Sequence, residues 1–184
     1  HGWFLARQFD NEANPAYHRN TTGPEVLRDF TGMDLDYFVS GWGTGGTVTG
    51  AGQMIKLARP NVKVIGAEPE NAMLLSGGEW SPHKIQGWTP DFIPGVLNKD
   101  VMDQLVNISD DDAIATAQSL AQQEGIFCGI SSGATMCAAL TIAKDAPPGS
   151  TFCVMLPDTG ERYLSTPLFE NISTDSDDDW LETL

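Results

Sequence analysis

Basic residues are scarce in this chain. Ten of its 184 residues are lysine or arginine and 25 are aspartate or glutamate, which gives a formal net charge of -15 at pH 7. A charge of this sign argues against nucleic acid and against an anionic membrane surface as partners. An anionic ligand would therefore have to be held by local backbone dipoles rather than by the field of the whole protein.

Cysteine and histidine are also rare. The three cysteines are Cys128, Cys137 and Cys153, and none forms a Cys-x-x-Cys pair. An odd number without such a pair argues against a disulfide framework and a zinc site, and favours a reducing, cytoplasmic setting. We interpret all three as small core residues. The three histidines are far apart in the sequence, so no metal site is expected.

Long apolar runs are absent. No stretch could span a bilayer, and no signal-peptide pattern is present. The chain starts at His1 without a methionine, and an apolar segment follows over residues 2–5. This beginning suggests a processed or incomplete piece, and a targeting segment upstream would direct the protein to an organelle instead of the cytoplasm.

The first half of the chain has the pattern of a βαβ unit. We predict a strand over residues 36–40, a glycine-rich turn over 41–46, a helix over 47–58 and a strand over 62–67. This order favours a parallel sheet. The fold class we expect is therefore α/β, with three layers in which helices flank a parallel sheet.

The rest of the chain continues this alternation. Ser109 is a candidate N-cap for a helix that Gly125 closes. The other expected elements are a strand over 105–108, a short apolar segment over 128–130, a helix over 134–144 and a strand over 152–156. Residues 8–24 are rich in turn-forming residues and suggest a connection, and residues 69–99 have no clear period, which is often a sign of a functional loop.

The glycine-rich turn is the strongest local signal. It reads Ser-Gly-Trp-Gly-Thr-Gly-Gly-Thr over residues 40–47, directly between a strand and a helix. Backbone amides at a helix N-terminus are unsatisfied and favour an anion, and glycine lets the backbone approach it closely. The hydroxyls of Thr44 and Thr47 can add donors. The turn therefore predicts a phosphate site, and the alternative is a tight turn that needs glycine only for packing.

The glycine-rich turn alone does not determine which phosphate-containing ligand would bind. The turn lacks the Gly-Lys-Ser/Thr ending of a Walker loop. It does contain Gly41-x-Gly43-x-x-Gly46, and Glu68 ends the next strand, where a dinucleotide fold places the acid that binds ribose. An NAD-binding Rossmann domain is therefore an alternative.

Several longer motifs point to one family. They are Gln8-Phe9, NPAYH over 14–18, TTGPE over 21–25, GTGGT over 43–47, HKIQG over 83–87, FIP over 92–94, GISSGA over 129–134 and GERYLST over 160–166. In this order and over roughly residues 8–170, the chain resembles cysteine synthase (O-acetylserine sulfhydrylase). Cystathionine β-synthase shares the architecture, but HKIQG and GERYLST favour cysteine synthase.

The resemblance implies a pyridoxal 5′-phosphate (PLP) enzyme of fold type II, the tryptophan-synthase-β-like fold. This chain would be its larger C-terminal domain, with the N-terminal portion absent. The implied divisions are a connection over 1–24, a PLP-phosphate-binding domain over 25–170 and an acidic tail over 171–184. The implied reaction is β-replacement, in which O-acetyl-L-serine and sulfide give L-cysteine and acetate, and the implied assembly is a homodimer.

The resemblance also assigns roles to single residues. The cofactor phosphate would be held by Gly43, Thr44, Gly45, Gly46 and Thr47. At the other end of the cofactor, Ser131 would donate to the pyridine nitrogen and Pro157 would pack beside the ring. Gln8 would lie beside the substrate carboxylate, and Gly87 near the substrate amine.

A serine at the pyridine nitrogen fits β-replacement. A neutral hydroxyl leaves that nitrogen largely unprotonated, whereas an aspartate would keep it protonated and favour a long-lived carbanion. Loss of a leaving group from the β-carbon then competes better with racemisation and transamination. Without the resemblance, Ser131 would be interpreted as a helix N-cap; Ser132 could take that role instead.

One required residue is missing. Enzymes of this kind need a lysine that carries the cofactor and moves protons, and the family places it upstream of all residues present here. The five lysines are Lys56, Lys63, Lys84, Lys99 and Lys144. Only Lys84 lies in a motif that lines the site, and the family does not use that position. We therefore expect no catalytic residue in this chain, which would be inactive alone; a binding protein that has lost the lysine half is a further alternative.

Overall fold

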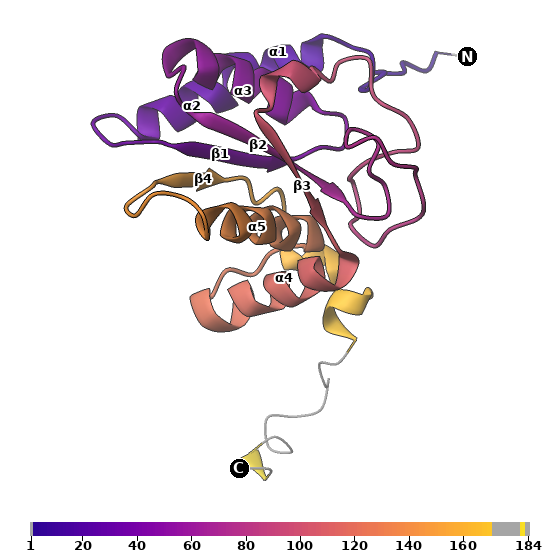
Figure 1. Cartoon of the computed structure of the whole chain (residues 1–184). Helices are drawn as coiled ribbons and strands as arrows, with labels where there is room; N and C mark the ends of the chain where they lie inside the picture. The colour runs from indigo at the N-terminus through magenta and orange to yellow at the C-terminus, as the bar shows by residue number, and fades with distance from the viewer. Residues whose placement is uncertain (1, 171–180, 183–184) are drawn as a thin grey trace.

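A four-stranded parallel sheet forms the middle layer of the protein (Figure 1). The computed structural model describes residues 2–170 and 181–182. The strands are β1 (Tyr37–Gly41), β2 (Lys63–Pro69), β3 (Gln104–Ile108) and β4 (Phe152–Val154), in the order β3-β2-β1-β4. Every neighbouring pair is parallel. This confirms the predicted α/β class and places the carboxyl ends of all strands at one edge.

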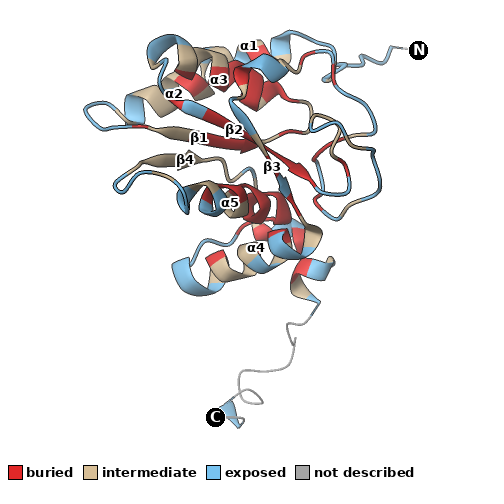
Figure 2. Cartoon of the chain, in the orientation of Figure 1, coloured by how far each residue is buried: buried red, intermediate tan, exposed pale blue. Residues whose placement is uncertain are grey.

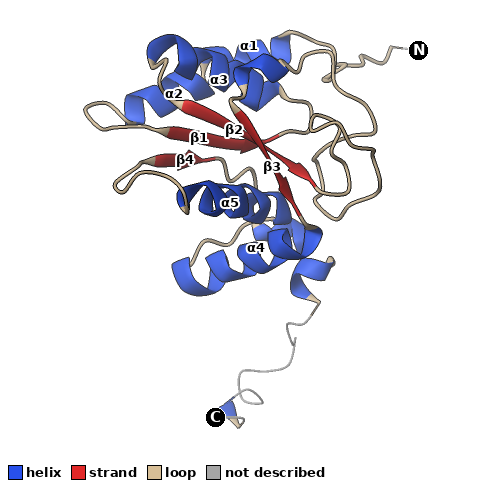
Figure 3. Ribbon diagram, viewed as in Figure 1, coloured by secondary structure: helices blue, strands red, loops and turns tan. Residues whose placement is uncertain are grey.

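Helices cover both faces of the sheet, which gives three layers (Figure 3). On one face lie α1 (Ala13–Asn20), α2 (Thr22–Asp29) and α3 (Gly46–Ala58). On the other lie α4 (Asp110–Glu124) and α5 (Ile130–Ala143). Three short 3-10 helices span Lys99–Val101, Gly160–Tyr163 and Pro167–Phe169. None of the helices described is both long and apolar enough to cross a membrane.

The sheet separates two hydrophobic cores (Figure 2). Successive side chains of a strand point to opposite faces. Phe38 and Val64 therefore pack into the core under α3, whereas Val39 and Ile65 pack into the core under α5. All four side chains are at most 1% exposed, as expected for parallel strands that are covered on both sides.

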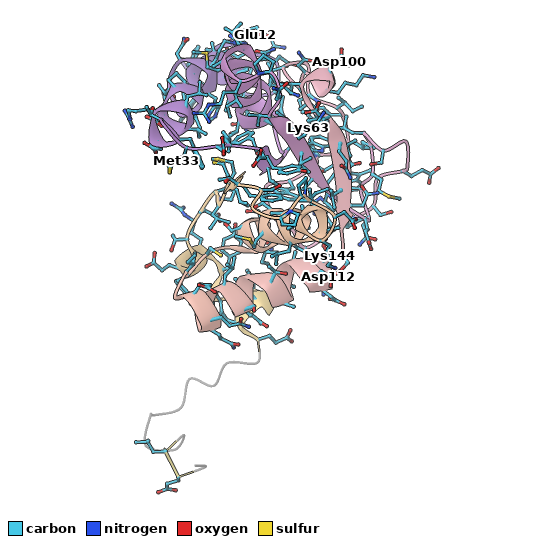
Figure 4. All side chains as sticks on the ribbon, turned by 60° about the vertical axis from the view of Figure 1, so that its left-hand side comes forward. Glu12, Met33, Lys63, Asp100, Asp112 and Lys144 are labelled. Atoms are coloured by element: carbon cyan, nitrogen blue, oxygen red, sulfur yellow. The ribbon has the colours of Figure 1, made fainter. Side chains whose placement is uncertain are left out.

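Side chains fill the space between the layers (Figure 4). Lys63 marks β2 in the middle layer of that view. Glu12 and Met33 lie in the layer of α1 to α3, and Asp112 and Lys144 lie in the layer of α4 and α5.

Burial raises the pKa of all three cysteine thiols, which are free.

The capping predicted for α4 is confirmed. The Asp112 amide donates to Ser109 Oγ at 3.1 Å, and Gly125 closes the helix with φ +69°. Three aspartates occupy the first turn, where their charge complements the helix dipole.

The predicted start of α5 was wrong. The helix begins at Ile130 with Gly129 as its N-cap, and Cys128 makes an isolated bridge to Thr159. A Cβ atom built on Gly133 would lie 2.1 Å from the Ala113 carbonyl oxygen of α4. Residues 131–133, which the prediction left outside the helix, are therefore helical, and Gly133 allows α4 to pack closely on α5.

Residues 8–24 also differ from the prediction of a turn-rich connection. Two helices begin in this segment, and α2 continues past residue 24. Both pack on α3: a Cβ atom on Gly50 would lie 2.1 Å from the Pro15 carbonyl oxygen, and one on Gly23 would lie 2.7 Å from Met54 Cβ. The segment is polar because its outer faces are exposed. Most of the predicted acidic tail lies outside the described residues.

Candidate functional site

The glycine-rich turn connects the carboxyl end of β1 to the start of α3. Gly45 is the N-cap of α3, with φ +81°, a left-handed conformation that glycine adopts without strain. Gly45 has no side chain with which to cap the helix. Amides in the first turn of a helix have no partners within the helix, and the helix dipole favours an anion beside them.

Glycine is required in this turn because other groups approach closely. A Cβ atom on Gly43 would lie 2.0 Å from the Gly87 carbonyl oxygen, and one on Gly46 would lie 2.0 Å from Asn14 Oδ1. A Cβ atom on Gly45 would lie 2.3 Å from Leu97 Cδ1. The structure thus brings Gly87, from a distant loop, against the turn.

The two threonines of the turn are held by side chains of α1. Asn14 Nδ2 donates to Thr44 Oγ1 at 2.9 Å, and the Gly46 amide donates to the same oxygen at 3.2 Å. Thr47 Oγ1 lies 3.3 Å from His18 Nε2. Because Thr44 Oγ1 accepts two hydrogen bonds, its own proton remains available to a ligand.

His18 is a second supporting residue. Its Nδ1 lies 2.9 Å from Thr22 Oγ1, and burial lowers the pKa of its ring, which keeps the ring neutral near pH 7. If Thr22 donates to Nδ1, then Nε2 carries the proton and donates to Thr47, which leaves the Thr47 proton free. Asn14 and His18 are four residues apart on α1, a spacing that places both on one helix face; this signal could have identified them as a pair.

Ser131 lies in the first turn of α5 and is 3% exposed. Thr135 Oγ1 lies 2.8 Å from the Ser131 carbonyl oxygen and 2.7 Å from the Met155 carbonyl oxygen, so its single proton is shared between the start of α5 and the end of β4. Pro157 lies two residues after Met155 and is exposed. Ser131 and Pro157 therefore lie at the same sheet edge as the glycine-rich turn. The interpretation of Ser131 or Ser132 as an N-cap was wrong, since Gly129 holds that position.

A tyrosine and an aspartate lie beside this helix start. Tyr163 OH donates to Asp158 Oδ2 at 2.6 Å. Burial, together with Asp158, raises the pKa of Tyr163 to about 12, so the phenol is neutral. The sequence gives no sign of this contact, because it depends on how residues 157–163 fold back.

Gln8 is exposed, and its backbone carbonyl accepts from Asn14 Nδ2 at 2.9 Å. The same amide group donates to Thr44, so Gln8 is connected to the glycine-rich turn through one side chain. Gly87 has φ +82°, and no atom lies within 4 Å of where its Cβ would be. Lys84 is exposed.

Glu68 argues against the dinucleotide alternative. Its side chain is fully buried at the end of β2. The carboxylate accepts from the amides of Leu75 at 3.1 Å and Ser76 at 2.9 Å, and also from the Ser76 hydroxyl. A ribose acid would have to face a ligand, whereas this carboxylate is used to hold a loop.

Comparisons with known proteins agree on one family. Residues 1–158 match the family described as pyridoxal-phosphate dependent enzyme. The chain is 58% identical over its whole length to O-ureido-L-serine synthase of Streptomyces lavendulae, of which it covers 57%. It is 47% identical over 92% of its length to cysteine synthase of Staphylococcus aureus, of which it covers 54%.

Solved structures show the same fold. A mutant of O-ureido-L-serine synthase bound to O-ureido-L-serine superposes with a TM-score of 0.96 at 57% identity, over all of this chain and 57% of that one. Cysteine synthase from Entamoeba histolytica gives 0.86 at 37% identity, over 98% of this chain and 53% of that one. The chain thus spans just over half the length of these relatives, and it belongs to the family of pyridoxal-phosphate dependent enzymes.

Proposed function

We propose that this chain is the cofactor-binding part of an enzyme that replaces the β-substituent of O-acetyl-L-serine. With sulfide as the nucleophile, the products are L-cysteine and acetate. The observation that carries the proposal is the start of α3, where glycines 43, 45 and 46 exclude side chains and the N-cap Gly45 has no side chain to occupy the amides of the first turn. The proposal includes a homodimer and a cytoplasmic location.

The residues present fit the phosphate of PLP. The amides of the turn, with the hydroxyls of Thr44 and Thr47, would hold it without any lysine or arginine. Asn14 and His18 orient these hydroxyls from behind. This arrangement suits an acidic protein, because the anion is bound by fixed dipoles in a small region.

Ser131 fits the other end of the cofactor. When bound there, PLP would supply an electron sink for the α-carbon of the substrate. The buried Ser131 hydroxyl would donate one hydrogen bond to the ring nitrogen without protonating it, and Pro157 would pack beside the ring. Gln8 and Gly87 would lie around the substrate carboxylate and amine.

The lysine that carries the cofactor has no candidate in this site. Lys84 has an exposed side chain, and its backbone amide donates to Asp110 Oδ1 at 2.9 Å. We place the catalytic lysine in the remainder of the enzyme, and we expect this chain alone to be inactive.

Synthesis of O-ureido-L-serine is the second candidate. The relative of that name is 58% identical, against 47% for the cysteine synthase. The two products differ only in the group on the β-carbon, so the same site residues would serve both. The difference lies in the nucleophile, which is sulfide for cysteine and hydroxyurea for O-ureido-L-serine.

Product analysis of the full-length enzyme separates these functions. The enzyme is incubated with O-acetyl-L-serine and either sulfide or hydroxyurea, and the products are identified by chromatography and mass spectrometry. Cysteine formation supports the first proposal, and formation of O-ureido-L-serine alone supports the second. Cystathionine from serine and homocysteine would support a cystathionine β-synthase-like enzyme, and no product from any pair would contradict all three.

A further inference from the structure

Asn14 contacts two parts of the site that have different proposed ligands. Its Nδ2 group donates to the Gln8 carbonyl at 2.9 Å and to Thr44 Oγ1 at 2.9 Å. A carbonyl oxygen can only accept, so the nitrogen of the Asn14 side chain must be the atom that faces Gln8. The NH₂ group has two protons, and these two hydrogen bonds use both. One side chain therefore connects the residue proposed for the substrate carboxylate to the turn proposed for the cofactor phosphate.

Close packing of α1 on α3 leaves the Asn14 side chain little freedom. A Cβ atom on Gly46 would lie 2.0 Å from Asn14 Oδ1 and 2.6 Å from Asn14 Cγ. The side chain thus occupies space that any larger residue at the start of α3 would need. The next residue, Pro15, is held in the same way, with its carbonyl oxygen 2.1 Å from where a Gly50 Cβ atom would be. Asn14 is therefore fixed relative to the turn that contains Thr44.

The segment around Gln8 has a second support. The Val96 amide donates to the Phe9 carbonyl at 3.1 Å, and the rings of Phe9 and Phe92 lie edge to face with their centroids 5.1 Å apart. These contacts would keep the segment folded without Asn14. The Gln8 side chain itself is exposed. Asn14 therefore acts on it through the backbone, by setting where the Gln8 carbonyl lies.

We propose that Asn14 is a positioning residue that couples the binding of the amino-acid substrate to the binding of the cofactor phosphate. This inference rests on the proposed function. One proton of the Asn14 side chain holds Thr44 so that its hydroxyl proton points to the anion site. The other proton holds the Gln8 backbone so that the Gln8 side chain meets the substrate carboxylate. Loss of this one group therefore weakens the binding of both ligands, each through a different residue.

The test uses Asn14→Leu in the full-length enzyme, because leucine has nearly the shape of asparagine but no donor. The Kd of PLP is measured by fluorescence titration of the apoenzyme. The KM for O-acetyl-L-serine is measured at saturating PLP, with sulfide or hydroxyurea, whichever the wild type uses. Both constants should rise by about threefold to tenfold, the range for one lost hydrogen bond. Asn20→Leu is the matched control, an exposed asparagine at the end of the same helix, and it should change neither. Asn14→Ala is the second variant if leucine prevents folding.

Double mutants separate positioning from a general structural effect. In a Gln8→Ala background, Asn14→Leu should no longer raise the KM, but it should still raise the Kd of PLP. In a Thr44→Val background the pattern should reverse: the effect on the Kd is lost and the effect on the KM stays. A general disturbance of the fold would instead raise both constants in both backgrounds.

The inference is overturned if Asn14→Leu changes only one of the two constants or neither. It is also overturned if the increase in the KM persists without the Gln8 side chain, or the increase in the Kd without the Thr44 hydroxyl. Failure of the wild-type enzyme to bind PLP or to use O-acetyl-L-serine would contradict the proposed function itself, so the two failures are distinct.

Discussion

Gly43 and Gly87 are in direct backbone contact, since a Cβ atom on Gly43 would lie 2.0 Å from the Gly87 carbonyl oxygen. The Thr89 amide strengthens this contact by donating to the Trp42 carbonyl at 3.0 Å. The loop that contains HKIQG is therefore attached to the turn proposed to bind phosphate. A side chain at Gly43 would therefore have to displace the turn or the loop.

Replacing Gly43 by alanine should weaken PLP binding by about tenfold or more, which is ~1.4 kcal/mol. The new methyl group cannot share space with a carbonyl oxygen, so the turn must shift. Fluorescence titration of the full-length apoenzyme with PLP measures the change. Gly95→Ala is the control, because its Cβ would lie 3.3 Å from Asp10 Oδ1, the movable end of an exposed side chain. Equal affinity in the two variants would contradict the role of the turn.

Glu68→Gln should destabilise the protein by roughly 2 kcal/mol, because the buried carboxylate accepts from two backbone amides and a hydroxyl, whereas an amide offers one acceptor. Urea unfolding measures the difference. Glu70→Gln is the control, since Glu70 is exposed. If both variants unfold at the same urea concentration, Glu68 does not stabilise the loop.

Ser109→Ala should cost about 1 kcal/mol of the free energy of unfolding, because the Asp112 amide loses its acceptor at the start of α4. The comparison is Ser119→Ala in the middle of the same helix, where alanine has the better helix propensity. Thermal unfolding compares them. A smaller loss at Ser109 than at Ser119 would argue against the cap.

Asp103 should make stability depend on pH in the acid range. Burial raises its pKa, but hydrogen bonds from Lys56 and the Val64 amide and the charges of Lys56 and Lys63 together lower it below the ordinary 3.8. The stabilisation is therefore present above that value and is lost as the pH falls through the lowered folded pKa. Asp103→Asn should flatten this part of the stability curve, and Asp100→Asn, at an exposed position, should not. A wild-type slope in Asp103→Asn would contradict the assignment.

The sequence was sufficient to predict those features of the fold that depend on residues close to one another along the chain. The βαβ order, the glycine-rich turn and the Ser109 cap depend on local periodicity and on residue types with specific backbone roles. Glu68 could not be interpreted correctly, because its partners Leu75 and Ser76 follow in a loop without a period. The Asp158–Tyr163 pair was missed for the same reason, and the start of α5 depends on packing against α4 that only the assembled fold defines.

A crystal structure of the protein with PLP tests the central claim most directly. The account predicts the phosphate within ~3 Å of backbone amides of residues 44–47, with the pyridine nitrogen facing Ser131. A phosphate bound elsewhere, or a ring nitrogen that faces away from Ser131, would contradict it.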